Sequence, residues 1–245
     1  MIKIVALDVD GVIIDSAHEN FIVCQKVLEK RGIKLADENR FRKGRNFLRS
    51  SLSMYGIAEL TLQGKDFDKM NQEEFDKFIV EHKNESRQFA NDFHSMRKIL
   101  QDNNYDKWFA LNKIFSGIKN VIDKLSKKFI IVVISTKDFH SISTAFDRVG
   151  IDIDKDNIFS KEISENKADQ IKNICNKFAV KPEEIFFLDD QPKHLEGVKE
   201  LGVKTALAGW GYNNDTQKAY AKRLGIPIID KYDELEEVIK SLNKK

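Results

Sequence analysis

The chain has 245 residues, of which 41% are hydrophobic and 33% are charged, and its formal net charge is +2. This length allows one large domain, or a core domain with a smaller second unit. The balanced charge gives no argument for a nucleic-acid or membrane partner, and no apolar stretch approaches the length of a membrane span. The first strand begins at once, without a signal peptide, and Cys24 and Cys175 lie in helical patterns, so we expect a cytoplasmic protein.

The first predicted element is an apolar strand that stops at two carboxylates. Ile2–Leu7 is typical of a strand that is buried on both faces in a parallel sheet. Asp8 and Asp10 follow it, and Gly11 lets the chain turn away sharply. A buried strand does not accommodate acids in its interior, so both acids should lie just past its C-terminal end, where open parallel sheets bind ligands. A solvated turn with two surface acids is the alternative.

The sequence pattern over residues 17–116 predicts an all-helical insert. They show helical periodicity and polar connections, but no convincing buried strand. The apolar residues at helical spacing form four groups: Phe21, Cys24, Val27 and Leu28; Phe47, Leu48 and Leu52; Phe75, Phe78 and Ile79; and Phe89, Phe93, Met96 and Leu100. Phenylalanines at this spacing are typical of a helical core, and residues 1–16 and 117–245 then form the other domain.

Strands that alternate with helices return near Gly117. Buried strands are predicted over residues 129–134, 158–159, 185–188 and 203–208, with a last edge strand over residues 227–229. The helices between them carry apolar residues on one side. This alternation predicts an α/β fold, in which a doubly wound parallel sheet is covered by helices on both faces.

Three of these strands end in polar clusters. The clusters are Asp8 and Asp10, Ser135 and Thr136, and Asp189 and Asp190. If the strands are neighbours, one crevice holds four carboxylates, which require a cation because like charges at close range repel. Hard oxygen ligands suit Mg²⁺, and no nearby set of His and Cys suggests zinc. A cation, hydroxyls and a lysine are suited to phosphoryl transfer, and a carboxylate can serve as the nucleophile.

The same residues resemble the sequence motifs of the haloacid dehalogenase superfamily. Asp8-Val9-Asp10-Gly11-Val12 is similar to its first motif, Ser135 to its second, Lys167 to its third, and Phe186-Phe187-Leu188-Asp189-Asp190 to its fourth. They occur in the family's order over the whole chain outside the helical insert. The resemblance implies a Rossmann-like core, with residues 17–116 as a helical cap between the first and second motifs.

The resemblance also implies a role for each motif residue. Asp8 would be the nucleophile and a metal ligand, and Asp10 would act as acid and base, with its backbone carbonyl on the metal. Ser135 and the Thr136 amide would hold a phosphoryl oxygen, and Lys167 would steady the charge. Asp189 and Asp190 would hold Mg²⁺. Val12 replaces a threonine that is common in the family, and the proline that often follows the lysine is missing after Lys167.

Asp10 favours a phosphate ester over a haloacid as substrate, because an alkoxide leaving group needs a proton and a halide does not. We therefore expect a Mg²⁺-dependent phosphatase acting on a small phosphate monoester. A sugar phosphomutase would use the same residues. A phospho-acceptor signalling domain and a catalytically silent binding protein are further alternatives. The order of the motifs and the insert argue against the signalling domain, and the complete acid set argues against the silent protein.

A basic stretch in the insert is a candidate for substrate specificity. It consists of Arg40, Arg42, Lys43, Arg45 and Arg49, around Gly44. Lys43 or Arg45 would pair with a second anionic group of the substrate. A solvated basic face is the alternative. The sequence leaves open which phosphate ester is hydrolysed and what the oligomeric state is.

Overall fold

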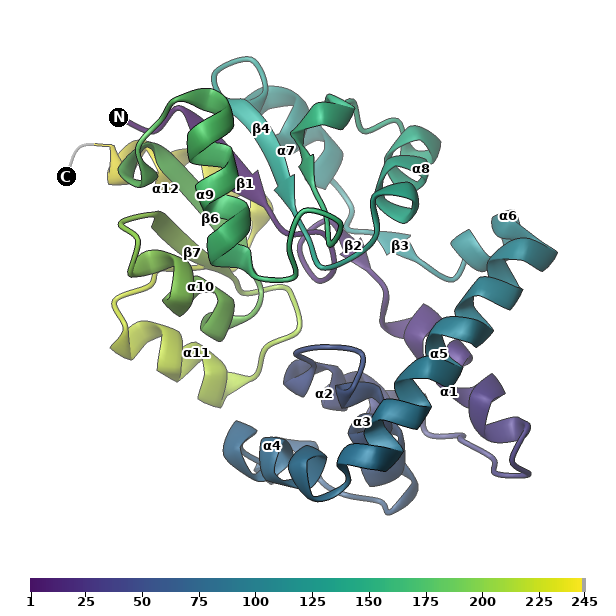
Figure 1. Cartoon of the computed structure of the whole chain (residues 1–245). Helices are drawn as coiled ribbons and strands as arrows, with labels where there is room; N and C mark the ends of the chain where they lie inside the picture. Colours follow the sequence, from purple (N-terminus) through teal and green to yellow (C-terminus); the bar gives the residue numbers. More distant parts are fainter. Residues whose placement is uncertain (244–245) are drawn as a thin grey trace. The chain divides into compact units, whose positions relative to one another are not determined.

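A computed structural model of the chain describes residues 1–243 and divides into two compact units (Figure 1). One unit comprises Met1–Asp15 and Ile114–Lys245, and the other comprises Ser16–Lys113. These bounds lie close to the expected domain limits at residues 16 and 117. Within residues 1–243, no helix is both long enough and apolar enough to cross a membrane.

The first unit contains a six-stranded sheet in the order β5-β4-β1-β6-β7-β8. The strands are β1 (Ile4–Leu7), β4 (Ile130–Ile134), β5 (Ile158–Phe159), β6 (Ile185–Asp189), β7 (Lys204–Ala208) and β8 (Ile228–Ile229). Every neighbouring pair is parallel. The predicted doubly wound α/β fold is therefore confirmed, with β8 at an edge.

Strand β1 lies in the middle of this sheet, which explains its apolar sequence. It pairs with β4 on one side and β6 on the other, so that Ile4 is opposite both Ile130 and Ile185. All four residues of β1 are fully buried. Since β4, β1 and β6 are adjacent and parallel, the residues that follow them come together at one edge of the sheet.

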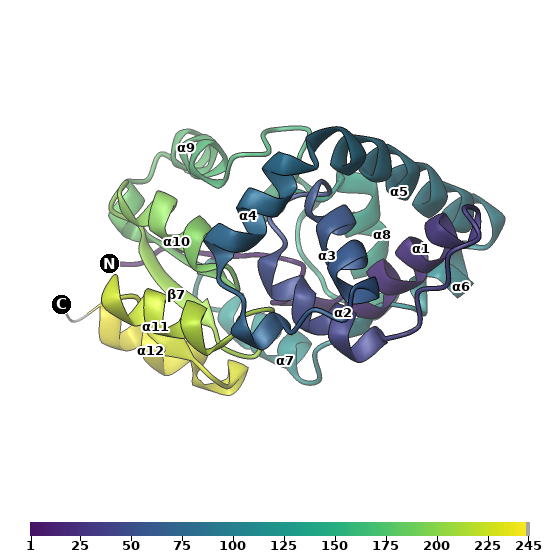
Figure 2. The ribbon, with the colours of Figure 1, turned by 90° about the horizontal axis from the view of Figure 1, so that it is seen from below.

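Helices cover both faces of the sheet. They are α7 (Ile118–Leu125), α8 (Phe139–Val149), α9 (Lys167–Phe178), α10 (Pro192–Lys199), α11 (Asp215–Arg223) and α12 (Leu235–Leu242), with short 3-10 helices at Lys155–Asn157, Pro182–Glu184 and Tyr232–Glu234. Ile4 and Ala6 of β1 share a core with Ile171 of α9 and Leu195 of α10. Helices α7 and α12 lie on the opposite face from α9 and α10 (Figure 2).

The second unit is a helical bundle with an aromatic core. Its elements are α1 (Ala17–Glu29), α2 (Glu38–Gly44), η1 (Arg45–Phe47), α3 (Ser53–Leu62), η2 (Phe67–Lys69), α4 (Gln72–Glu81), α5 (Lys83–Asn103) and α6 (Tyr105–Phe109). The helix expected around Phe47 and Leu48 is wrong, because Phe47 ends a 3-10 turn and Leu48 is extended. The spacing reflects tertiary packing instead: the Phe47 ring stacks on Phe75, with centroids 5.4 Å apart.

The chain leaves the sheet unit and returns to it at neighbouring points. Strands β2 (Ile14–Asp15) and β3 (Lys113–Ile114) form a two-stranded sheet, and the Phe115 N–H donates to the Ile13 carbonyl at 3.1 Å. Ser16 precedes α1, but its side chain makes no capping hydrogen bond. Asp15 instead accepts a hydrogen bond from the Tyr212 hydroxyl at 2.8 Å, so the first turn is tied to the loop after β7.

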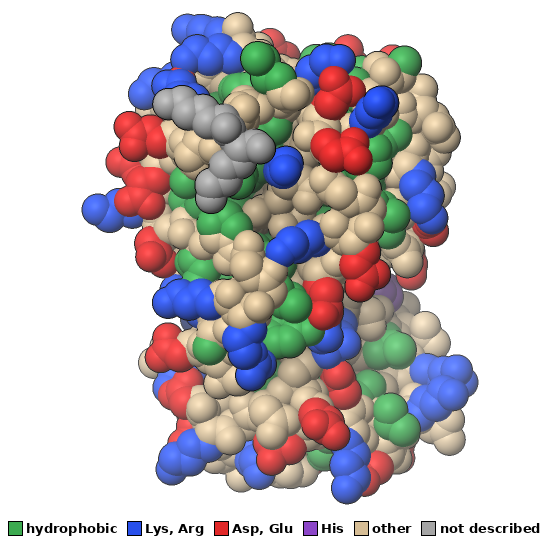
Figure 3. Space-filling view, turned by 90° about the vertical axis from the view of Figure 1, so that its left-hand side faces the viewer, with side chains coloured by type: hydrophobic (Ala, Val, Ile, Leu, Met, Phe, Trp, Pro, Cys, Tyr) green, Lys and Arg blue, Asp and Glu red, His purple; other side chains and the backbone are tan. Residues whose placement is uncertain are grey.

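One face of the molecule reflects the balanced composition. On the face drawn in Figure 3, basic and acidic side chains are interspersed, and neither sign gathers into a large patch. This face provides no extended electrostatic footprint for a polyanion.

Candidate functional site

Three carboxylates converge where β1 and β6 end. The side chains of Asp8, Asp189 and Asp190 each place an oxygen within 4.8 Å of the others. Asp8 is 7% exposed, Asp189 is fully buried and Asp190 is 2% exposed. Adjacent parallel strands bring these acids together although they are far apart in the sequence.

Lys167 is the cation closest to this group. Its Nζ lies 2.5 Å from Asp8 Oδ1 and 3.8 Å from Asp189 Oδ2, and it donates to the Ile134 carbonyl at 2.7 Å. Burial raises the pKa of Asp8 to about 6, and the negative charge of Asp189 adds to this, while Lys167 opposes it. The opposing effect of Lys167 is not large enough to restore an ordinary carboxyl pKa.

Lys167 is held in place at the start of α9, although the proline that often follows this lysine in the family is absent here. Asn166 caps the helix by accepting the N–H groups of Ala168 and Asp169. One turn later, the buried Gln170 directs its Nε2 at the carbonyls of Ser135 (2.9 Å), Ser160 (3.1 Å) and Ser164 (2.7 Å). These contacts join α9 to the end of β4, so the lysine enters the site from a rigid position.

Asp189 is held by donors from the turn that follows it. The Gln191 N–H donates to its Oδ1 at 2.8 Å, and the His194 imidazole contacts both carboxylate oxygens. Burial alone would raise the pKa of Asp189. The charges of His194 and Lys167 and these hydrogen bonds outweigh burial and hold its pKa below the usual value. Asp189 therefore stays ionised more readily than Asp8.

Asp190 is packed between two glycines. A Cβ atom at Gly11 would lie 2.1 Å from Asp190 Oδ2, and one at Gly211 would lie 2.3 Å from Asp190 Cβ. Gly11 also has a φ of +86°, which disfavours any side chain. The Tyr212 N–H donates to Asp190 Oδ2 at 2.7 Å. The loop after β7 thus forms one wall of the site.

Asp10 lies two residues beyond Asp8, but its side chain is not a member of the three-acid group. Its carboxylate pairs with Lys137, whose Nζ lies 2.9 Å from Oδ1 and 3.2 Å from Oδ2. The side chain of Lys137 is only 11% exposed. The structure therefore separates the two acids of the first motif into different electrostatic environments.

The hydroxyl residues lie at the end of β4, next to β1. Ser135 is buried, and its Oγ accepts the Lys137 N–H at 3.1 Å. Thr136 is exposed. Because β4 is the neighbour of β1, both residues follow the strand adjacent to the one that carries Asp8.

The family model of a haloacid dehalogenase-like hydrolase matches residues 2–202. The chain belongs to this family. It is therefore a hydrolase, and the match spans the strands and helices that carry Asp8, Ser135, Lys167 and Asp189. No curated protein matches the chain.

Solved structures of other proteins share the fold of this hydrolase over nearly their whole length. A haloacid dehalogenase-like hydrolase from Streptococcus pneumoniae is 15% identical, with a TM-score of 0.64 and coverage of 97% of this chain and 98% of that chain. A predicted phosphoglycolate phosphatase from Haemophilus somnus is 16% identical, with a TM-score of 0.67 and coverage of 97% and 98%. A predicted phosphatase from Clostridium acetobutylicum is 18% identical, with a TM-score of 0.67 and coverage of 98% and 99%. At these identities the likeness shows the fold alone.

The donor set of this hydrolase fits a divalent cation. Three carboxylates face one ammonium and one imidazole, so negative charge is in excess in a buried site. Carboxylate oxygens are the ligands of hard cations such as Mg²⁺ and Ca²⁺. Among residues 1–243, these three acids are also the one group of three or more metal-ligating side chains that are close enough to share an ion.

The two basic residues singled out in the helical unit differ in exposure. The Lys43 side chain is 54% exposed and pairs with Asp68. Arg45 is only 2% exposed, in the 3-10 turn after α2. Lys43 is therefore at the surface of the helical unit, while Arg45 belongs to its interior.

Sequence reasoning missed three residues of the site. The predicted polar cluster at the end of β4 stops at Thr136, one residue before Lys137, and Tyr212 holds Asp190 through its backbone N–H, which leaves no side-chain signal. His194 follows the fourth-motif acids by a few residues, at the start of α10. A histidine soon after a strand-end acid pair is a usable signal, because the intervening turn folds it back.

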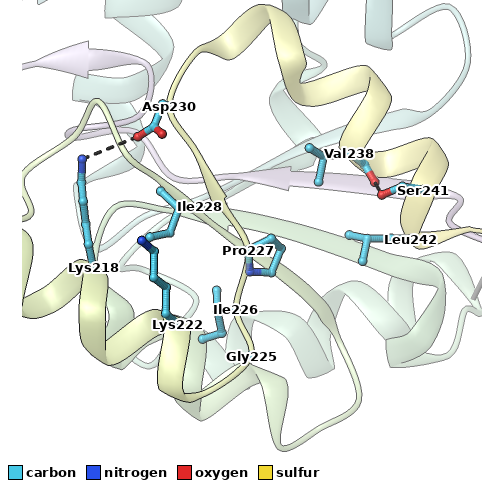
Figure 4. A pocket seen from close by; sticks show the side chains of 10 residues that line it. All are labelled: Lys218, Lys222, Gly225, Ile226, Pro227, Ile228, Asp230, Val238, Ser241 and Leu242. Atoms are coloured by element: carbon cyan, nitrogen blue, oxygen red, sulfur yellow. Dashed lines mark hydrogen bonds and ion pairs between the residues drawn. The ribbon is translucent and has the colours of Figure 1, made fainter.

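A surface groove of 690 Å³ lies elsewhere in the same unit. It is lined by residues of α11, β8 and α12, including Lys218 and Asp230, which form an ion pair at 3.6 Å (Figure 4). None of the strand-end acids lines it. The chemistry of the three-acid group is therefore separate from this groove.

Proposed function

We propose that this hydrolase is a Mg²⁺-dependent phosphatase that cleaves a small phosphate monoester through an aspartyl phosphate on Asp8. The contact of 2.5 Å between Lys167 and Asp8, beside Asp189 and Asp190, carries the proposal. It combines a nucleophile, a fixed positive charge and ligands for a cation at one point. Relatives of the same fold that are named as phosphatases support this reaction class.

Asp8, Asp189 and Asp190 would hold Mg²⁺ through their side chains, and the Asp10 carbonyl is a further proposed ligand. When bound, the ion neutralises charge on the phosphoryl oxygens. Lys167 contributes a second positive charge beside Asp8. Ser135 and the Thr136 amide, at the end of the adjacent strand, would donate to a phosphoryl oxygen.

In the first half-reaction, a carboxylate oxygen of Asp8 attacks phosphorus. A bond forms between this oxygen and phosphorus while the bond from phosphorus to the ester oxygen breaks. The leaving oxygen takes a proton from Asp10. The products are an aspartyl phosphate on Asp8 and the free alcohol.

In the second half-reaction, Asp10 removes a proton from water. The water oxygen bonds to phosphorus, and the bond between phosphorus and the Asp8 oxygen breaks. Inorganic phosphate leaves, Asp8 is again a carboxylate, and Asp10 is again protonated. Lys137, which pairs with the Asp10 carboxylate, would orient it for both proton transfers.

The helical unit is proposed to act as the cap that selects the alcohol part of the substrate. Lys43 is the more accessible of its two candidate residues, since Arg45 is buried. A substrate with a second anionic group, such as a phosphorylated small acid, would use such a cation.

Trapping of the phosphoenzyme tests this function. The protein would be incubated with an aryl phosphate, quenched in acid and digested, and the phosphorylated peptide would be located by mass spectrometry. We expect phosphate on Asp8, no turnover in chelator and recovery with Mg²⁺. Asp8→Asn should abolish turnover and phosphoenzyme together. Phosphate on another residue, or full activity in chelator, would refute the proposal.

A further inference from the structure

His194 contacts an acid of the proposed metal site through its ring. It lies near the start of α10, and its Nδ1 is 3.1 Å from Oδ2 and 3.3 Å from Oδ1 of Asp189. The side chain of His194 is 29% exposed, whereas that of Asp189 is fully buried. The imidazole thus reaches from the rim of the site to a buried carboxylate.

Few other donors of the chain serve Asp189. The Gln191 N–H donates to Oδ1 at 2.8 Å, and Lys167 lies 3.8 Å from Oδ2, beyond hydrogen-bond distance. The next residue, Pro192, is the first of α10 and has no N–H to donate. The His194 side chain, from α10, therefore supplies the second hydrogen-bond donor that the backbone of this turn cannot provide to Asp189.

We propose that His194 is a positioning residue that orients the Asp189 carboxylate for a divalent cation shared with Asp8 and Asp190. This inference rests on the proposed function, because it assumes that the three acids bind the cation. A proton on Nδ1 lets the ring donate to the carboxylate and restricts its rotation. Partners that orient ligating groups typically contribute about 10–100-fold to metal affinity.

A pair of near-isosteric variants tests the hydrogen bond. In His194→Asn, the amide nitrogen takes the place of Nδ1 and keeps a donor. His194→Leu has a similar branched shape but no donor. His194→Ala is a second variant without a donor, in case the leucine perturbs folding. His140→Leu, at an exposed histidine of α8, is the matched control.

Mg²⁺ binding would be measured by titration calorimetry and by the rise in Tm on adding Mg²⁺, and kcat would be measured at saturating Mg²⁺. We expect His194→Leu and His194→Ala to weaken Mg²⁺ binding about 10–100-fold. We expect His194→Asn to stay within about threefold of wild type, and His140→Leu to be unchanged. Because the role is positioning, kcat at saturating Mg²⁺ should change far less than the affinity.

The outcomes separate this inference from the proposed function. Wild-type protein that binds no Mg²⁺ would refute the metal site itself. If wild type binds Mg²⁺ and His194→Leu and His194→Ala bind it equally well, the positioning role is wrong while the proposed function stands. An asparagine variant as weak as the leucine variant would also refute the hydrogen bond. A lower Tm in chelator, with unchanged Mg²⁺ affinity, would assign His194 a purely structural role.

Discussion

The ammonium of Lys137 lies 2.9 Å and 3.2 Å from the two carboxylate oxygens of Asp10. This pair lies at the ends of two neighbouring strands, β4 and β1, and the lysine side chain is largely buried. The pairing fixes the orientation of the acid that is proposed to exchange protons with the leaving group and with water. Asp10 is therefore held by a different partner from Asp8.

Replacing Lys137 tests this arrangement. We expect Lys137→Met to lower kcat for an alkyl phosphate about tenfold, because Asp10 loses the partner that orients it. This loss is a part of the total rate enhancement that proton-transfer catalysis typically provides. Lys172→Met, at an exposed lysine paired with Asp169, is the control and should leave kcat unchanged. Steady-state kinetics would measure both. An unchanged kcat for Lys137→Met would show that Asp10 is oriented without it.

The leaving group should determine the effect of Asp10→Asn. Loss of proton transfer should slow an alkyl phosphate by about 10²–10⁴-fold. An activated aryl phosphate should be slowed less at the first step, because its leaving group hardly needs a proton. Since water activation is lost too, the phosphoenzyme should persist. Rapid-quench measurement with both substrates would check this, and equal loss on both would argue against Asp10 as the acid.

The raised pKa of Asp8 predicts a pH dependence of the metal-free protein. In the folded state the pKa is about 6, above its usual value of 3.8, so the folded state binds the proton more tightly than the unfolded state. Protonation of Asp8 should thus increase the free energy of unfolding as pH falls from about 6 to 3.8. This contribution should be lost as pH rises through 6. At low pH this contribution of Asp8 to the free energy of unfolding should reach about 3 kcal/mol.

Denaturant unfolding in chelator from pH 4 to pH 7 would measure this contribution, as the difference between wild type and Asp8→Asn. Because a bound cation requires ionised Asp8, Mg²⁺ affinity should instead increase with pH and level off above about 6. A pH-independent difference in stability between the two proteins would contradict the raised pKa.

Alanine substitutions at Gly211 and Gly197 test whether the loop after β7 constrains Asp190. Gly211→Ala places a Cβ 2.3 Å from Asp190 Cβ and 2.5 Å from the Gly11 carbonyl oxygen, so Asp190 or the loop must move. We expect weaker Mg²⁺ binding and a lower Tm. Gly197→Ala, within α10, meets no atom within 4 Å and should be neutral, or stabilising by up to about 1 kcal/mol. Calorimetry on both variants would check this, and unchanged Mg²⁺ binding by Gly211→Ala would show that the loop does not constrain Asp190.

The sheet could be predicted from the sequence because its central strands are buried on both faces. The apolar runs before Asp8, Ser135 and Asp189 are strand-forming, and nearly all their residues are buried within the sheet. The order of the strands could not be read from these runs, because pairing depends on packing between distant segments. The helix expected around Phe47 was wrong for the same reason.

The candidate site was predictable only in part. The acid pairs stand out because carboxylates follow buried strands, but the contact of Lys167 with Asp8 joins residues 159 positions apart, and only the family resemblance indicated it. Tyr212 contacts Asp190 through a backbone N–H, which any residue except proline could supply. Contacts of this kind leave no trace in residue type.

The chain leaves the sheet unit at β2 and returns to it at β3, and the pairing of these two strands has a consequence for the order of folding. Pairing β1 with β4 closes a loop of about 120 residues, and in a flexible chain this closure costs about 4 kcal/mol in entropy, before a constant term. The ends of the helical unit lie side by side, as the hydrogen bond between Phe115 and Ile13 shows. If the helices form first, the two strands are already neighbours and most of this loop is already closed. Local helical contacts would then nucleate a sheet whose own pairings are long-range.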